Sequence, residues 1–235
     1  MTLRIPTLRA SRRQRRQRRA ARPFPHKSYA VTAIVAAWCI VAFGYLSTHE
    51  DAWHQLGYAD AFDVWDGSYY APITSVFLHV DVIHLLFNLY WLWVLGRTME
   101  RTLGTLRYLG FFLISAVVSS GCELAIGGET GVGLSGVVYA MAAYMWIGRR
   151  RIPWFEVMDD SSAKLFGGWF VLCIVLTEAG VWNVGNIAHG SGLVFGLAVG
   201  YLFAIQRYRV PAATTAGAML IFTAVTLFWC PWAYR

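Results

Sequence analysis

Long apolar stretches dominate this chain, and short polar or charged segments separate them. Seven stretches can be marked, at Tyr29–Ser47, Val82–Thr98, Tyr108–Ile126, Leu134–Gly148, Leu165–Val181, Ile187–Ile205 and Ala212–Trp232. A helix that crosses a bilayer needs about 20 apolar residues, with a range of about 17–25. Six stretches come close to this length, whereas the fourth has only 15 residues. The pattern predicts an all-α polytopic membrane protein with seven helices.

The composition supports this prediction. Hydrophobic residues make up 57% of the 235 positions and charged residues 14%, against about 25% charged residues in soluble domains. This apolar surplus is too large for one water-soluble core, so the lipid bilayer is an expected partner. The cysteines lack the spacing of a disulfide framework or a zinc site, and no metal or other cofactor is expected; they are Cys39, Cys122, Cys173 and Cys230.

The positive charge is distributed unevenly. Ten of the 20 Lys and Arg residues lie within 1–28, and this segment is predicted to be a disordered, arginine-rich cytoplasmic tail. Topology and attraction to anionic lipid explain such a tail more simply than nucleic-acid binding, which stays open as an alternative. With this end in the cytoplasm, every Lys and Arg except Arg235 falls on the cytoplasmic side. The predicted orientation is therefore N-terminus inside and C-terminus outside.

The first outer segment, at 48–81, contains no Lys or Arg and is rich in acidic and aromatic residues. Aromatic side chains at this density are typical of the membrane–water interface. We expect part of the segment to lie there as short helical pieces. Because no organelle-targeting pattern is present, the orientation favours the plasma (inner) membrane of a bacterium.

Polar side chains inside a predicted span need a partner or a function, because they are costly in lipid. Ser135 opens the short fourth stretch and lies between Gly133 and Gly136. Fifteen helical residues cover about 22 Å of a hydrocarbon core of about 30 Å. If Arg149 marks the cytoplasmic end, Ser135 lies below the outer surface and is reached through a water-filled cavity. A serine at a helix contact would satisfy the same short pattern.

His189 lies near the outer start of the sixth stretch, on the same side of the membrane as Ser135. Ala188, Gly192, Gly196 and Gly200 recur in this stretch at a spacing of four, which is typical of close helix packing. The fourth stretch offers a matching small surface, and such packing brings His189 toward Ser135. A histidine within hydrogen-bond reach can take the serine proton. The alternative is a histidine that only bonds a neighbouring helix.

Other polar residues extend this pattern. His84 and Asn88 share one face of the second stretch, where two donors could stabilise an oxyanion or simply join helices. Tyr139 lies one turn below Ser135 and could support the imidazole or belong to the core. Glu123 is expected to meet a polar partner or the outer interface rather than to perform chemistry, and Glu178 has no pattern that brings it beside the histidine. We therefore expect a dyad.

Three of these segments together resemble the rhomboid family of intramembrane serine proteases. The resemblance covers about Thr74 to Gly200 and includes His79-Val-Asp-Val-Ile-His84 followed by Asn88, Gly133-Leu-Ser-Gly136 followed by Tyr139, and Ala188-His189 with Gly192 and Gly196. It implies Ser135 as nucleophile, His189 as general base, and an oxyanion hole of His84, Asn88 and the Ser135 backbone. It also implies substrates with transmembrane helices, cut in or beside such a helix.

The resemblance further implies a six-helix catalytic core at 29–206, with an additional C-terminal transmembrane helix within 207–235. One position departs from the family pattern. Many members carry a Trp-Arg pair in the first loop, where this chain has Tyr70 and Ala71, which leaves the loop geometry open. Two other functions remain as alternatives: an inactive relative that binds membrane clients, and a small transporter. The first typically lacks the serine or the histidine, and the second often shows internal repeats.

Overall fold

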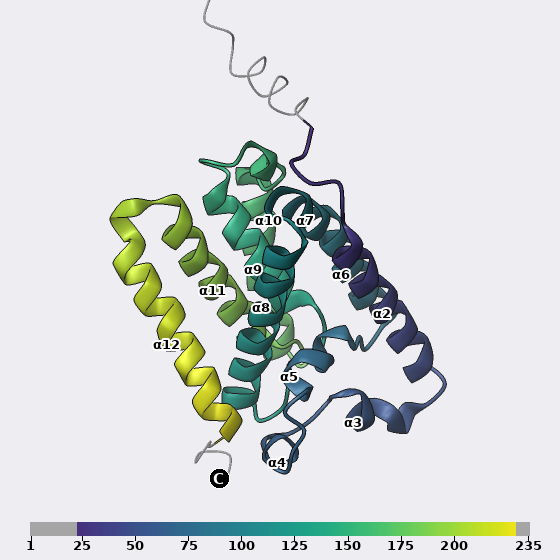
Figure 1. Cartoon of the computed structure of the whole chain (residues 1–235). Coiled ribbons are helices and arrows are strands. Elements are labelled where there is room, and N and C mark those ends of the chain that lie inside the picture. The colour runs from purple at the N-terminus through teal and green to yellow at the C-terminus, as the bar shows by residue number, and fades with distance from the viewer. Residues whose placement is uncertain (1–22, 229–235) are drawn as a thin grey trace, which may run out of the picture.

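A computed structural model describes residues 23–228. Its long helices, shown in Figure 1, run through the molecule in a bundle. They are α2 (Ala30–Leu46), α6 (Val82–Trp91), α7 (Arg97–Leu103), α8 (Thr105–Gly127), α9 (Ser135–Gly148), α10 (Asp160–Glu178), α11 (Asn186–Ala204) and α12 (Arg209–Phe228). A π-helical turn, Leu92–Gly96, joins α6 to α7. The segment between α2 and α6 forms short helices: α3 (Trp53–Leu56), α4 (Ala61–Trp65) and α5 (Ala71–Thr74).

Within residues 23–228 the predicted apolar stretches fall largely on helices, and the end of the seventh stretch lies outside the described residues. In this described part, four helices are long and apolar enough to cross a membrane, namely α8, α10, α11 and Gln206–Phe228. A fifth is added if Ala71–Phe77 and Val82–Leu103 form one span bent by 101°. The shorter apolar helices are α2 and α9. The predicted all-helical membrane fold is confirmed, whereas residues 1–22 of the predicted arginine-rich tail at 1–28 lie outside the described residues.

Two helix boundaries differ from the apolar pattern because polar side chains extend the helices, one at a start and one at an end. Asp159 accepts a hydrogen bond from the Ser162 backbone N–H at 2.9 Å, so α10 begins at Asp160, five residues before the predicted stretch. At the other end of the second stretch, the helix continues through charged residues to Leu103. Glu100 allows this because it is buried and accepts a hydrogen bond from the Thr32 backbone N–H at 2.9 Å.

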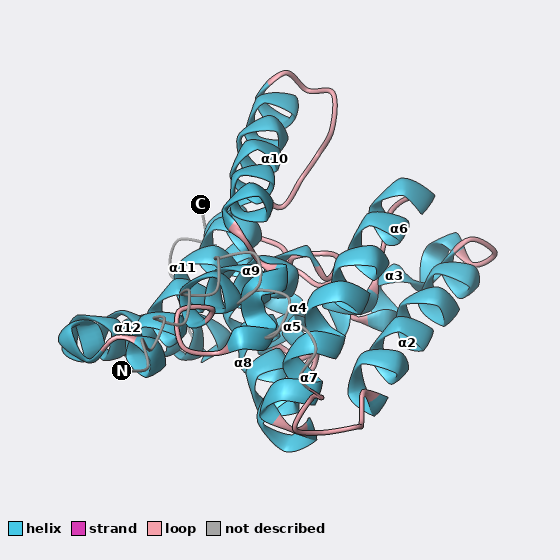
Figure 2. Ribbon diagram, turned by 90° about the horizontal axis from the view of Figure 1, so that it is seen from above, coloured by secondary structure: helices cyan, strands magenta, loops and turns pink. Residues whose placement is uncertain are grey.

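The central element is α9, which has α8, α10, α11 and α6 packed around it. Figure 2 shows α9 in the middle, α12 at one edge, and α10 projecting from the bundle. Every residue of α9 from Gly136 to Met145 is buried. A helix that is apolar on all sides needs such surroundings. By contrast, only 11% of the apolar window of α10 is buried, so that helix presents most of its surface to lipid.

Small residues allow α9 and α11 to touch along their backbones. A Cβ atom at Gly192 would overlap the carbonyl oxygen of Gly136, and one at Gly196 would lie 2.8 Å from the carbonyl carbon of Ala140. The predicted contact between the two small-residue surfaces is therefore confirmed. It fixes the start of α11 beside the start of α9.

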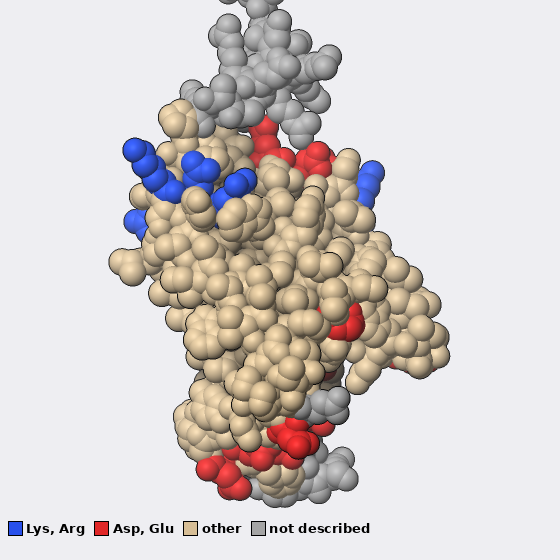
Figure 3. All heavy atoms as spheres, turned by 90° about the vertical axis from the view of Figure 1, so that its right-hand side faces the viewer, with Lys and Arg blue, Asp and Glu red and all other residues tan. Residues whose placement is uncertain are grey.

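Charge divides the two ends of the bundle. On the face seen in Figure 3, Lys and Arg side chains gather near one end, and acidic side chains without basic ones gather near the other. Between the two ends lies a wide zone of mostly uncharged residues, broken on this face by a small acidic patch. This distribution matches a protein whose middle lies in hydrocarbon.

Candidate active site

Ser135 is the first residue of α9 and follows a turn that requires glycine. Gly133 has a φ of +97°, a conformation that residues with a Cβ atom rarely adopt. A Cβ atom at this position would also lie 2.6 Å from Cε1 of His84. The turn therefore brings the His84 imidazole against the backbone that leads into Ser135.

His189 lies in the first turn of α11, and only 4% of its surface is exposed. Its ring lies over Tyr139, with 4.8 Å between ring centroids and 34° between ring planes. The Tyr139 hydroxyl donates a hydrogen bond to the Phe166 carbonyl oxygen at 3.2 Å, which holds that ring in place. The Tyr139 ring therefore lies against the imidazole, and its role in supporting the histidine stays a prediction.

Ser135 and His189 line the same cavity, which has a volume of about 720 Å³. Within residues 23–228 no hydrogen bond joins the two side chains, and Nδ1 of His189 is buried without a partner. Hydrogen bonds between catalytic groups often tighten only when substrate binds. The arrangement provides a hydroxyl and an imidazole that line one cavity, as acyl transfer requires.

His84 and Asn88 line the same cavity from α6. The Asp81 carboxylate accepts a hydrogen bond from the His84 backbone N–H at 2.8 Å and so caps the helix. The Asn88 amide donates to the His84 carbonyl oxygen at 3.0 Å, which leaves its second N–H free to bind another acceptor. The structure thus brings five predicted site residues to one cavity, namely His84, Asn88, Ser135, Tyr139 and His189. Gly133 lies against His84, and Gly136 lies against the Ala188 backbone. Residues 23–228 contain no group of three His, Cys, Asp or Glu side chains that could hold a metal ion.

Comparison with known proteins agrees with this geometry. The family model described as the Rhomboid domain matches residues 66–206, more than half of the chain. This chain belongs to the rhomboid family. Rhomboid protease GlpG of Yersinia pseudotuberculosis serotype I (strain IP32953) is 35% identical over 129 residues, which cover 55% of this chain and 46% of that protein. Rhomboid protease GlpG of Salmonella typhi is 32% identical over 178 residues, which cover 73% of this chain and 62% of that protein. The chain spans about half the length of the Yersinia relative.

A partly buried acidic contact connects two helices of this rhomboid beside the cavity. Glu123 on α8 accepts a hydrogen bond from the Ala188 backbone N–H at 2.7 Å, and its side chain lines the cavity. The sequence left a polar partner and the outer interface open for Glu123, and the structure shows a backbone partner on α11. A glutamate within an apolar helix indicates that a polar contact exists. Its partner lies 65 residues away along the chain, so no local pattern identifies it.

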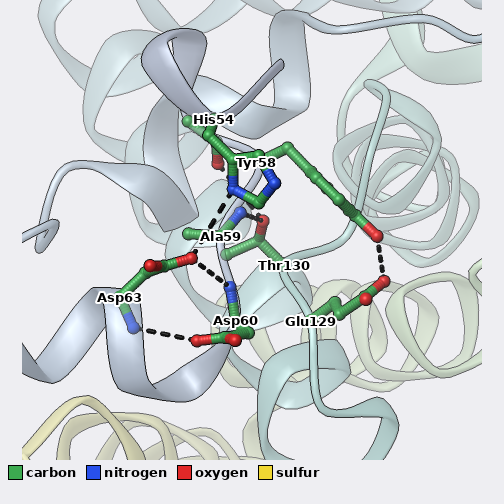
Figure 4. Close-up of polar contacts among 8 residues, drawn as sticks. His54, Tyr58, Ala59, Asp60, Asp63, Glu129 and Thr130 are labelled. Carbon is green, nitrogen blue, oxygen red and sulfur yellow. Dashed lines mark hydrogen bonds and ion pairs between the residues drawn. The ribbon is translucent and has the colours of Figure 1, made fainter. Parts of the chain in front are cut away.

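The outer segment of the rhomboid is fastened to the loop before Ser135, as Figure 4 shows. The Thr130 backbone N–H donates to the Ala59 carbonyl oxygen at 2.8 Å, and the Thr130 hydroxyl accepts from the Ala59 backbone N–H at 3.0 Å. The Tyr58 hydroxyl donates to the Glu129 carboxylate. Partial burial and this carboxylate raise the pKa of Tyr58 to about 12. Sequence reasoning missed this contact, which we call the outer clamp (Tyr58, Ala59, Glu129 and Thr130).

A second contact holds the outer segment where the family's Trp-Arg pair is absent. Ala71 is fully buried in a small apolar cluster, and Tyr70 is exposed. The Trp65 indole N–H donates to the Thr226 carbonyl oxygen of α12 at 3.1 Å. The additional C-terminal helix therefore contacts the outer segment directly. The loop geometry that the sequence left open is an ordered one, fixed by α12 and the outer clamp.

Proposed function

We propose that this chain is an intramembrane serine endopeptidase that cleaves membrane-anchored proteins in or beside a transmembrane segment. Ser135 is the nucleophile and His189 the general base. The observation that carries the proposal is the shared cavity, which is lined by a serine at a helix N-terminus and by a histidine whose ring lies over Tyr139. The names of the Yersinia and Salmonella relatives support the same activity.

The reaction proceeds in two steps. His189 takes the proton of the Ser135 hydroxyl while the oxygen attacks the scissile carbonyl carbon, which forms a tetrahedral oxyanion. The imidazolium then gives its proton to the leaving amine, and the C–N bond breaks to leave an acyl ester on Ser135. A water molecule, activated by His189, hydrolyses the ester and restores the serine.

The oxyanion is stabilised by His84, the Asn88 amide and the Ser135 backbone N–H. That N–H belongs to the first turn of α9, where backbone donors have no acceptor within the helix. The N-terminus of a helix also favours negative charge. A single donor of this kind contributes about 10²–10³-fold to kcat. His84 and Asn88 line the cavity beside Ser135, which supports this role.

Substrate helices reach the cavity sideways from the membrane, between α6 and α10. The rings of Phe87 on α6 and Trp169 on α10 both line the cavity and stack with centroids 4.7 Å apart. The low burial of α10 supports its displacement at modest cost. The basic end of the bundle faces the cytoplasm and the cavity opens to the outside. A bacterial plasma membrane is the proposed location, since the relatives above are bacterial.

Co-reconstitution with a model substrate tests the proposal. The substrate is a single-span protein with Gly and Pro in the outer half of its helix, and a Leu-rich version is the matched control. We expect wild-type protein to cut the first substrate near the outer interface, and Ser135→Ala and His189→Ala to leave it intact. Equal cutting by wild type and both variants would exclude this dyad.

A further inference from the structure

Glu123 has no role in the dyad or the oxyanion hole, yet its carboxylate lies in the same cavity. A carboxylate within an apolar helix needs hydrogen-bond donors to offset its loss of water. Its donor is the Ala188 backbone N–H, at 2.7 Å. Ala188 directly precedes His189 in the chain, so the carboxylate is anchored next to the residue that carries the imidazole.

The start of α11 depends on this side chain. The first backbone N–H groups of a helix lack an acceptor within it, and a side chain at the N-cap usually supplies one. The N-cap of α11 is Gly185, which has no side chain for this purpose. Glu123 supplies the acceptor from α8 instead, across 65 residues of sequence.

Glycines make the space that the carboxylate occupies. A Cβ atom at Gly127 would lie 2.8 Å from Oε1 of Glu123, and a Cβ atom at Gly185 would lie 3.2 Å from Oε2. A Cβ atom at Gly131 would lie 3.4 Å from the Glu123 Cβ atom. The fit is therefore close on three sides, which restricts the carboxylate to the start of α11.

We propose that Glu123 is a positioning residue that fixes the first turn of α11 and stabilises the His189 imidazolium through its negative charge. This inference rests on the proposed function, because the imidazolium forms only when His189 takes the Ser135 proton. An anion beside the helix N-terminus is itself stabilised by the helix dipole. Glu123 thus provides the acidic charge that the dyad lacks, without touching the imidazole.

Other titratable side chains share the cavity and define the control. They are His84 from α6, Tyr139 from α9, Cys173 from α10, and Asp51, His54, Tyr58 and Glu129. Glu129 is the matched carboxylate, because it lines the same cavity but accepts a hydrogen bond from Tyr58 instead of from α11. A general effect of cavity charge would appear equally in Glu123→Gln and Glu129→Gln.

The experiment measures the rate of covalent inactivation by a fluorophosphonate against pH, in detergent, for wild type, Glu123→Gln and Glu129→Gln. Glutamine keeps an oxygen acceptor for Ala188 and removes the charge. We expect Glu123→Gln to lower the plateau rate about tenfold, which corresponds to about 1.4 kcal/mol. The acid limb of the rate–pH profile, where protonation of His189 slows the reaction, should move about one pH unit lower. The reason is that the imidazolium is less stable without the charge. Glu129→Gln should leave that limb unmoved.

A wild-type rate and profile for Glu123→Gln would overturn the proposal, as would an equal shift in Glu129→Gln. If Glu123→Gln does not fold, the double variant Glu123→Ala with Gly185→Asp places a carboxylate at the N-cap itself. It should recover both the thermal stability and the acid limb that Glu123→Ala loses, and recovery of stability alone would contradict the charge effect. Absence of labelling in wild type would instead refute the proposed protease function.

Discussion

The backbone contact between α9 and α11 places the two reacting side chains, so a single methyl group there should disrupt the site. Gly192→Ala adds a Cβ atom that would overlap the Gly136 carbonyl oxygen and lie 2.9 Å from its carbon. Carbon atoms in contact are ordinarily about 3.5–4.0 Å apart. The helices must therefore separate by roughly 1 Å, beside Ser135 on one helix and His189 on the other.

Two magnitudes follow from this separation. Overpacking of a close contact costs about 1–3 kcal/mol, offset by up to about 1 kcal/mol from the better helix propensity of alanine. A misplacement of about 1 Å at reacting groups costs roughly 10²-fold in rate. Gly192→Ala should therefore lose about 10²-fold in fluorophosphonate inactivation rate while its melting temperature falls by a few degrees.

Gly190→Ala is the matched control on the same helix. Its Cβ atom would lie 3.5 Å from Cζ of Phe170, an ordinary contact. We expect this variant to keep at least the thermal stability of wild type and most of its inactivation rate. A wild-type rate in Gly192→Ala, or equal losses in the two variants, would refute the claim that this contact sets the geometry of the site.

Three further predictions concern other parts of the site. Asn88→Ala should slow substrate cleavage about 10–1,000-fold with little change in melting temperature, and an unchanged rate would remove Asn88 from the oxyanion hole. Phe87→Ala or Trp169→Ala should speed cleavage of a transmembrane substrate and leave inactivation by a small fluorophosphonate unchanged, because the stacked rings restrict only lateral access; equal changes in both assays would contradict this. The pKa of Tyr58 is raised from 10.0 to about 12 in the folded protein, so its stabilisation is complete below about pH 10 and is lost as pH rises through about 12. The melting temperature of wild type should therefore fall more steeply in that window than that of Tyr58→Phe, and parallel curves would refute a stabilising outer clamp.

The hydrophobic pattern predicted the helices because each apolar stretch is long and has a charged or glycine-rich boundary. The starts and ends were less accurate where capping decides them. The pattern placed the start of the fifth stretch at Leu165, whereas Asp159 caps the helix so that it begins at Asp160. Periodicity gives no sign of the π-helical turn Leu92–Gly96, since its residues are apolar like those of an ordinary helix.

The candidate site could be assembled from sequence because its residues share helix faces at a spacing of four. His84 with Asn88, and Ser135 with Tyr139, are pairs of this kind. Contacts between distant segments had no such pattern. Tyr58 and Glu129 lie 71 residues apart in two loops, so no periodicity connects them.

The central claim is that Ser135 is activated by His189. Labelling of the purified protein with a fluorophosphonate, followed by mass spectrometry of the modified peptide, tests it without knowledge of the natural substrate. The account predicts a single adduct on Ser135 that is lost in both Ser135→Ala and His189→Ala. A folded wild-type protein that stays unlabelled beside a reactive rhomboid control, or labelling that survives in His189→Ala, would contradict it.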